Sequence, residues 1–83
     1  MKPIRLSAHA LNYMNKRRFT VAEVEALRES PWQPAELGRL ECRKAYPFGK
    51  EWSKTLYATK EVLPIFVEHS GKIVVVTVYT YFY

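Results

Sequence analysis

The stretch Ile73-Val74-Val75-Val76-Thr77-Val78-Tyr79 decides the fold of this chain of 83 residues. It consists almost entirely of β-branched and aromatic residues, which favour a strand, and its apolar residues fall on both faces. A strand that is apolar on both faces lies in the middle of a sheet and is covered by other elements. We therefore predict a central strand over residues 73–79, covered on one side by helices.

Three further strands are predicted before this one, because the preceding residues are apolar and β-branched or alternate between apolar and charged. Their ranges are 40–46, 54–60 and 62–68. A turn at 47–50 should separate the first two strands, and His69-Ser70-Gly71-Lys72 is typical of a tight hairpin. Pro64 cannot donate a backbone hydrogen bond, so it should mark the start of its strand or an edge.

A first helix is predicted over residues 8–17. Ser7 precedes it as an N-cap, since its side-chain oxygen can accept a bond from an otherwise unpaired backbone N–H. At about 100° per residue, two sides of this helix differ in character. The side expected to face the core comprises Ala10, Leu11 and Met14. The neighbouring side, which we name the basic stripe, comprises His9, Tyr13, Lys16 and Arg17.

A second helix is predicted to begin after Thr20. Thr20-Val21-Ala22-Glu23 has the pattern of a capping box, in which Glu23 reaches back to the backbone of the cap residue. Ser30-Pro31 should end this helix, because the residue before a proline is pushed out of helical geometry. We predict that it serves as a packing element.

The order of these elements predicts an α+β fold. Two N-terminal helices should pack on one face of a four-stranded antiparallel sheet, and the other face should stay partly open. The length is that of one domain, spanning residues 1–83.

Charge is distributed unevenly along the chain, whose formal net charge is +5. Residues 1–18 carry only basic charges, residues 19–36 are mainly acidic, and residues 39–60 are again mainly basic. Such segregation can attract a polyanion such as RNA. It is equally compatible with a solvated surface that keeps a small domain soluble.

The remaining composition narrows the class of protein. A single cysteine, Cys42, allows no internal disulfide and fits a reducing compartment. No stretch approaches the roughly 20 apolar residues of a membrane helix, and the first residues do not resemble a signal peptide. His9, His69 and Cys42 lack the spacing of metal ligands. We therefore expect a cytoplasmic protein with no metal and no cofactor.

Several residues could carry chemistry. His9 could act as a general acid or base, for example on an RNA 2′-hydroxyl, and Arg17 and Arg18 could bind phosphate. Thr77 and Tyr79 share one face of the last strand and could line a site opposite the helices. The structural alternatives are a histidine that only bonds its neighbours, arginines that complement the helix dipole, and tyrosines that are ordinary strand residues.

These motifs resemble a bacterial family of small proteins, the domain-of-unknown-function family 4258. The resemblance rests on Leu6-Ser7-Ala8-His9-Ala10, on Arg17 eight residues after His9, on Phe19-Thr20 with Glu23-Val24, and on Val75-Val76-Thr77-Val78-Tyr79. It spans most of the chain, although the middle strands match only in pattern. This chain departs from the family at Arg18, where a small residue, often glycine, is usual. Arg18 would alter the turn between the helices or extend the basic surface.

The family looks related to BrnT-type and RelE-type toxins and to the barnase/colicin-like ribonuclease fold. The resemblance implies a toxin that cleaves RNA without a metal and is neutralised by an antitoxin protein. In that hypothesis His9, Arg17 and Tyr79 are catalytic, and the residues that contact RNA are Lys16, Arg18, Arg43, Lys44 and Thr77. The competing hypothesis is a non-catalytic module of the same fold that binds RNA or a protein partner.

Overall fold

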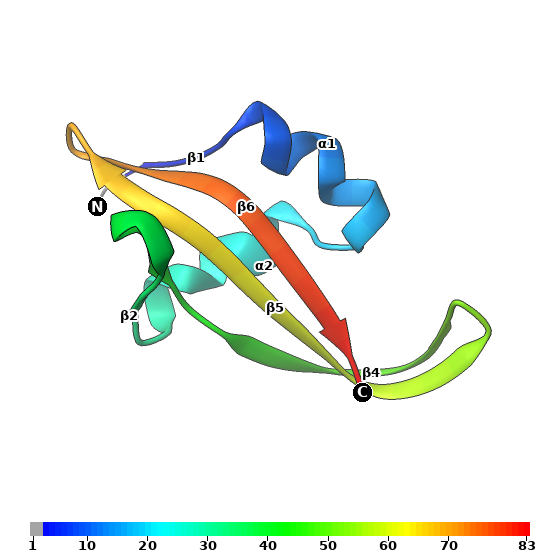
Figure 1. The fold of residues 1–83 in the computed structure, drawn as a ribbon. Helices are drawn as coiled ribbons and strands as arrows, with labels where there is room; N and C mark the ends of the chain where they lie inside the picture. Colours follow the sequence, from blue (N-terminus) through cyan, green and yellow to red (C-terminus); the bar gives the residue numbers. More distant parts are fainter. Residues whose placement is uncertain (1–2) are drawn as a thin grey trace.

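The computed structural model describes residues 3–83 as an α+β fold with two N-terminal helices and a mixed six-stranded sheet (Figure 1). The helical elements are α1 (Ala8–Arg17), α2 (Val21–Glu25) and the short 3-10 turns η1 (Ala26–Glu29) and η2 (Glu36–Gly38). The strands are β1 (Ile4–Leu6), β2 (Gln33–Pro34), β3 (Leu40–Glu41), β4 (Lys44–Trp52), β5 (Thr55–His69) and β6 (Lys72–Phe82). In Figure 1, α2 lies behind the sheet and the green η2 turn lies in front of it.

The predicted strand over residues 73–79 is confirmed and lies within β6, but it is central only in part. β6 has strands on both sides only over Ile73–Val75, where β1 pairs with it, and from Val76 onwards it is an edge of the sheet. The strand order is β1-β6-β5-β3-β2, with β4 also paired to β5. The prediction of four antiparallel strands was wrong, because β1 joins the sheet parallel to β6, with Ile4 opposite Ile73. Three residues are too few to show an alternation of apolar and polar residues, so β1 can be recognised as a strand only from its pairing with β6. The β5–β6 hairpin turns as predicted, at Ser70 and Gly71, which both have positive φ.

The two predicted strands at 54–60 and 62–68 are one long strand, β5. Pro64 neither starts this strand nor marks an edge of the sheet. It lies where the neighbour of β5 changes, since Val62 pairs with β4 and Ile65 pairs with β3. A residue without an N–H is tolerated at such a junction, where the hydrogen-bonded ladder is already interrupted.

The predicted turn at residues 47–50 is instead a β-bulge inside β4, where the register against β5 shifts by one residue. Gly49 has φ +58°, a conformation that glycine adopts readily. The chain reverses later, at Ser53 and Lys54, whose φ angles are 52° and 66°. These residues lack the glycine or asparagine that usually marks such a turn, so the sequence carries no clear signal for it.

Both predicted helix starts are confirmed. The Ser7 hydroxyl oxygen accepts the N–H of Ala10 at 3.1 Å and donates to the carbonyl of Val76 at 2.7 Å, which ties α1 to β6. Thr20 and Glu23 form both bonds of the capping box. The second helix is short, because after Glu25 the chain tightens into η1.

The core lies between the helices and the sheet. The fully buried apolar residues are Ala10, Phe19, Val24 and Leu27 on the helical side, and Cys42, Val62, Phe66, Ile73, Val75 and Val78 on the strands. The prediction that Leu11 faces the core was wrong, since its side chain is 53% exposed. Helix α1 packs near the β1–β6 edge, so only the narrow stripe of Ala10 and Met14 meets the core.

Cys42 is expected to be almost unreactive in the native protein. Burial, with a smaller contribution from the Glu41 carboxylate, raises the pKa of its thiol from 9.0 to about 11. At pH 8 the thiolate, which is the nucleophile, is therefore about 100-fold scarcer than in the unfolded chain. Labelling with a disulfide reagent such as Ellman's reagent should be at least about 100-fold slower in buffer than in denaturant. Equal rates in the two conditions would contradict the buried position.

Candidate functional site

The basic stripe of α1 lies along the edge of β6. Strand β1 pairs with β6 only as far as Val75, and α1 covers the edge beyond it. Arg17 Nη1 donates to Thr77 Oγ1 and to the carbonyl oxygen of Val78, both at 3.0 Å. The Thr80 hydroxyl in turn donates to the carbonyl oxygen of Arg17. These bonds fix the end of α1 and satisfy groups on the open edge of β6.

Aromatic rings surround the Arg17 guanidinium. Its central carbon lies 4.2 Å from the centroid of the Tyr13 ring and 4.8 Å from that of the Tyr79 ring. One turn earlier on α1, the ring centroids of His9 and Tyr13 are 4.6 Å apart. The structure therefore brings together His9, Tyr13, Arg17, Thr77 and Tyr79, which we name the Arg17 cluster. Lys16 lies beside it, with its ammonium nitrogen 5.4 Å from the Tyr13 ring centroid.

The Arg17 cluster offers an exposed imidazole and an oriented cation. Within residues 3–83, no carboxylate forms an ion pair with Arg17. Nη1 of Arg17 already donates to Thr77 and Val78, so the donors that could receive a phosphate are those on Nη2 and Nε, at the edge of a stacked guanidinium. Tyr13 lies one helical turn from His9 and one from Arg17, so its phenol ring stands between imidazole and guanidinium along the helix. The two groups are thus placed to contact neighbouring parts of one ligand.

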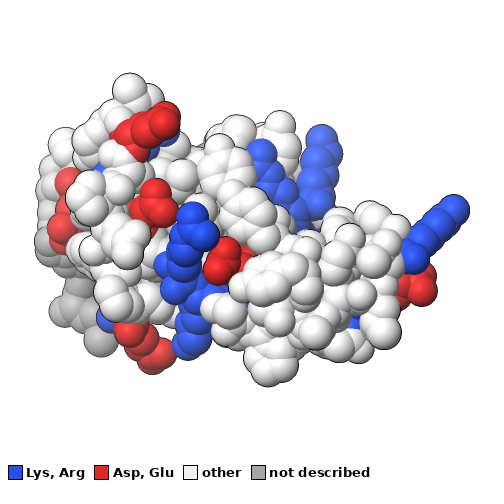
Figure 2. Space-filling model, turned by 60° about the horizontal axis from the view of Figure 1, so that its bottom comes forward, with Lys and Arg blue, Asp and Glu red and all other residues white. Residues whose placement is uncertain are grey.

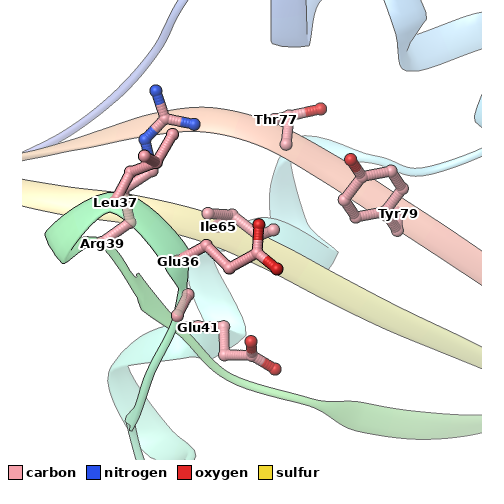
Figure 3. A pocket seen from close by; sticks show the side chains of 8 residues that line it. Glu36, Leu37, Arg39, Glu41, Ile65, Thr77 and Tyr79 are labelled. Atoms are coloured by element: carbon pink, nitrogen blue, oxygen red, sulfur yellow. The ribbon is translucent and has the colours of Figure 1, made fainter.

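A pocket of about 320 Å³ opens beside the cluster, on the sheet face opposite the helices (Figure 3). Thr77 and Tyr79 belong to both the pocket and the cluster. The sequence placed this pair opposite the helices, and the structure has it there. Figure 3 shows the Glu36 carboxylate directed across the pocket towards Tyr79.

Three charged residues of the pocket were not singled out from the sequence: Glu36, Arg39 and Glu41. They come from η2 and the residues that follow it, where the sequence predicted no element before the strand that begins at residue 40. At the rim, Leu37 is 84% exposed and has φ 60°, which is strained for a leucine. Strained residues of this kind gather at functional sites, but the strain is seen only in the structure and gave no signal in the sequence.

The other predicted RNA-binding residues do not join the cluster. Arg43 forms ion pairs with Glu61 at 3.3 Å and Glu41 at 4.0 Å, and Lys44 pairs with Glu29 at 3.7 Å. On the face that Figure 2 shows, red and blue side chains lie next to each other over the middle, whereas the blue side chains at the upper right have no red neighbour. The charge segregation along the sequence is therefore lost only in part, where folding pairs basic strand residues such as Arg43 and Lys44 with glutamates.

The side chain of Arg18 does not join the Arg17 cluster and packs against a different part of the molecule. Its guanidinium carbon lies 4.7 Å from the centroid of the Trp52 ring, on the β4–β5 hairpin. The backbone of Arg18 closes α1 in the left-handed conformation, with φ 59°. Glycine is the residue that usually takes this position at the end of a helix.

The comparisons with known proteins give no match: no protein-family model, no curated protein and no solved structure is similar to this chain. Residues 3–83 bring no three His, Cys, Asp or Glu side chains together as a group that could hold a metal ion. In the same range, no helix is long and apolar enough to cross a membrane.

Proposed function

We propose that this protein binds single-stranded RNA through the Arg17 cluster and the adjoining pocket. One observation carries the proposal: the Arg17 guanidinium lies against two tyrosine rings and has no carboxylate partner within residues 3–83. Elsewhere on the sheet, Arg43 and Lys44 are paired with glutamates. Arg17, by contrast, is oriented by its aromatic neighbours and keeps its charge available to a phosphate.

The chemistry of the cluster favours an unpaired strand over a duplex. Aromatic side chains stack on bases only where the bases are unpaired, and each such contact contributes about 1–3 kcal/mol. The ring of Tyr79 is 38% exposed, beside the Arg17 cation. The adjoining pocket adds the carboxylates of Glu36 and Glu41, which can accept bonds from the exocyclic amino group of a base.

Cleavage of the bound RNA is the second function that we propose, and the exposed His9 in contact with Tyr13 favours it. His9 would accept the proton of a 2′-hydroxyl, whose oxygen then attacks the adjacent phosphorus. The bond to the 5′-oxygen breaks, that oxygen takes a proton from solvent, and a cyclic phosphate remains. Because Tyr13 separates His9 from Arg17, the phosphate held by Arg17 neighbours the one that is cleaved, and Tyr79 stacks on a base. This activity would suit a toxin held in check by an antitoxin protein.

Binding is tested with a fluorescent single-stranded RNA and its change in anisotropy. Two cations near the strand, Arg17 and Lys16, predict a slope of about −1.4 for the logarithm of affinity against the logarithm of salt. Arg17→Ala should weaken binding at least about 10-fold and make the slope shallower by about 0.7. Lys54→Ala removes a cation of the β4–β5 turn that belongs neither to the Arg17 cluster nor to the adjoining pocket, and it should leave both values unchanged.

A second control separates binding from folding, because Arg17 also bonds to β6. Thr80→Val removes the bond from the Thr80 hydroxyl to the carbonyl oxygen of Arg17 but keeps the cation and every side chain of the Arg17 cluster, so its affinity for RNA should stay within about threefold of the native protein. All variants are compared at a temperature where circular dichroism shows them folded. If Arg17→Ala and Lys54→Ala bind RNA alike, the proposed interface is wrong.

Cleavage is tested by incubating mixed RNA with the protein in the presence of a chelator. The native protein should cut the RNA and leave cyclic phosphate ends. His9→Ala keeps Arg17 and Tyr79, so it should lose little RNA affinity but cut at least about 100-fold more slowly. Induced expression should arrest growth, and His9→Ala should relieve the arrest. Binding without any cutting would leave the non-catalytic module as the function; cutting by both proteins would point to a contaminant.

A further inference from the structure

A second, basic groove lies on the helical side of the molecule, between the end of α1 and the bulge of β4. Its volume is about 490 Å³. The polar residues that line it are Asn15, Arg18, Thr20, Lys50 and Lys60, and we name it the Arg18 groove. Figure 1 shows how it arises, because the light-green β4–β5 hairpin turns away from the main sheet and curls towards the end of α1.

The charge of the Arg18 groove is positive. Three lining residues are cationic and none is acidic. The Glu23 carboxylate compensates one of them, since its Oε1 accepts from Lys60 Nζ at 3.0 Å. The same oxygen accepts the backbone N–H of Thr20 at 2.8 Å, so the Glu23 carboxylate is held on its own side of the groove. Arg18 and Lys50 form no ion pair within the described residues 3–83.

Aromatic packing prepares Arg18 for an anion. Its guanidinium stacks on Trp52, and the Trp52 ring centroid lies 5.4 Å from that of Phe82. Phe48, which lines the groove, contacts the other end of this cluster, with 5.0 Å between its ring centroid and that of Phe82. Stacking occupies the flat face of the guanidinium and leaves the donors at its edge available for a bidentate contact. Because the support is a packed cluster, the cation is oriented before a ligand arrives.

We propose that the Arg18 groove binds a phosphate group. Arg18 supplies a planar pair of donors, Lys50 supplies a mobile charge, and Lys60 can donate the hydrogens that it does not give to Glu23. The Asn15 amide adds an uncharged donor. No residue of this groove belongs to the Arg17 cluster, so the inference does not depend on the proposed function.

A phosphate group has two sources, a free anion or the backbone of a strand, and the experiment separates them. Isotope-labelled full-length protein is titrated with inorganic pyrophosphate, and in a second arm with a five-residue oligouridylate. Sodium chloride keeps the ionic strength constant. Amide signals of Asn15, Thr20 and Lys50 should shift and saturate in at least one arm. Tighter binding of the oligonucleotide at these amides identifies a strand, and binding of pyrophosphate alone identifies a free anion.

Three variants test whether the phosphate group binds to the cations of the Arg18 groove. Lys50→Ala and, separately, Arg18→Gln should raise the ligand concentration that half-saturates the shifts of these amide signals at least about 10-fold. Lys54→Ala, which removes a cation from the same hairpin, should leave it unchanged. The proposal is overturned if neither probe produces saturable shifts, or if Lys50→Ala and Lys54→Ala behave alike. Loss of RNA affinity in Arg17→Ala with intact pyrophosphate binding would show that the two sites are independent.

Discussion

Replacement of Phe66 by alanine is expected to destabilise the protein by about 3–5 kcal/mol, the usual cost of removing a fully buried phenylalanine. Phe66 is 0% exposed and lies in the middle of the sheet, opposite Val75 on one side and Leu40 on the other. Trp32 packs its ring edgewise against it, with 4.9 Å between the centroids. No single neighbour can fill the space, because the contacts come from three separate parts of the chain.

This loss should be a large share of the free energy of unfolding of the whole protein. At about 0.05–0.15 kcal/mol per residue, a chain of this length has roughly 4–12 kcal/mol of stability. Urea denaturation followed by circular dichroism should therefore show Phe66→Ala largely unfolded or with a much lower midpoint. Leu56→Ala on the same strand is the matched control, since Leu56 is 74% exposed and its loss should change stability by less than about 0.5 kcal/mol. Similar midpoints for both variants would mean that Phe66 is not in the core.

Glu23→Ala is expected to cost about 2–4 kcal/mol, more than an ordinary helix cap contributes, because it also removes the partner of an ammonium group that reaches water only at the Arg18 groove. One carboxylate oxygen of Glu23 accepts both from the Thr20 backbone and from the Lys60 ammonium. Lys60 is only 8% exposed, so the substitution leaves a buried cation without its partner. Loss of the cap alone would account for about 1 kcal/mol.

The double variant Glu23→Ala with Lys60→Met separates these two contributions. Replacing a buried ion pair by apolar residues is often close to neutral, so the double variant should recover most of the stability, except for the lost cap. The measurement is a double-mutant cycle of urea denaturation curves, with an expected coupling above about 1 kcal/mol. Additive losses from the two single changes would show that the pair contributes nothing to folding.

The residues of the Arg17 cluster were predicted from the sequence, but the contacts between them were not. Helical spacing placed His9, Tyr13 and Arg17 on one stripe, and alternation placed Thr77 and Tyr79 on one face of the last strand. Helical spacing could not show that Arg17 reaches across to both strand residues. That contact depends on where β1 ends, because only beyond Val75 is the edge of β6 open to α1.

The charged residues were predicted less well. Arg43 and Lys44 were grouped with Arg17 because all three are basic, yet folding sets them against glutamates from other segments. Glu36 and Arg39 were not predicted as site residues, because nothing in a loop of mixed residues distinguishes a pocket wall from a solvated surface. Charge is a property of each residue, whereas the neighbours that neutralise it are set by the fold.

By itself, the sequence determined the features that depend on neighbouring residues. Caps at Ser7 and Thr20, the existence of strand β6 and the hairpin at Ser70 follow from local hydrogen bonding, burial and turn geometry. Only the tertiary structure decided the features that need distant partners. These are the parallel pairing of β1, the continuity of β5 through Pro64, and the bulge that turns the β4 hairpin towards α1. Their stabilisation comes from strand pairing and packing between segments far apart in the chain, which no local pattern records.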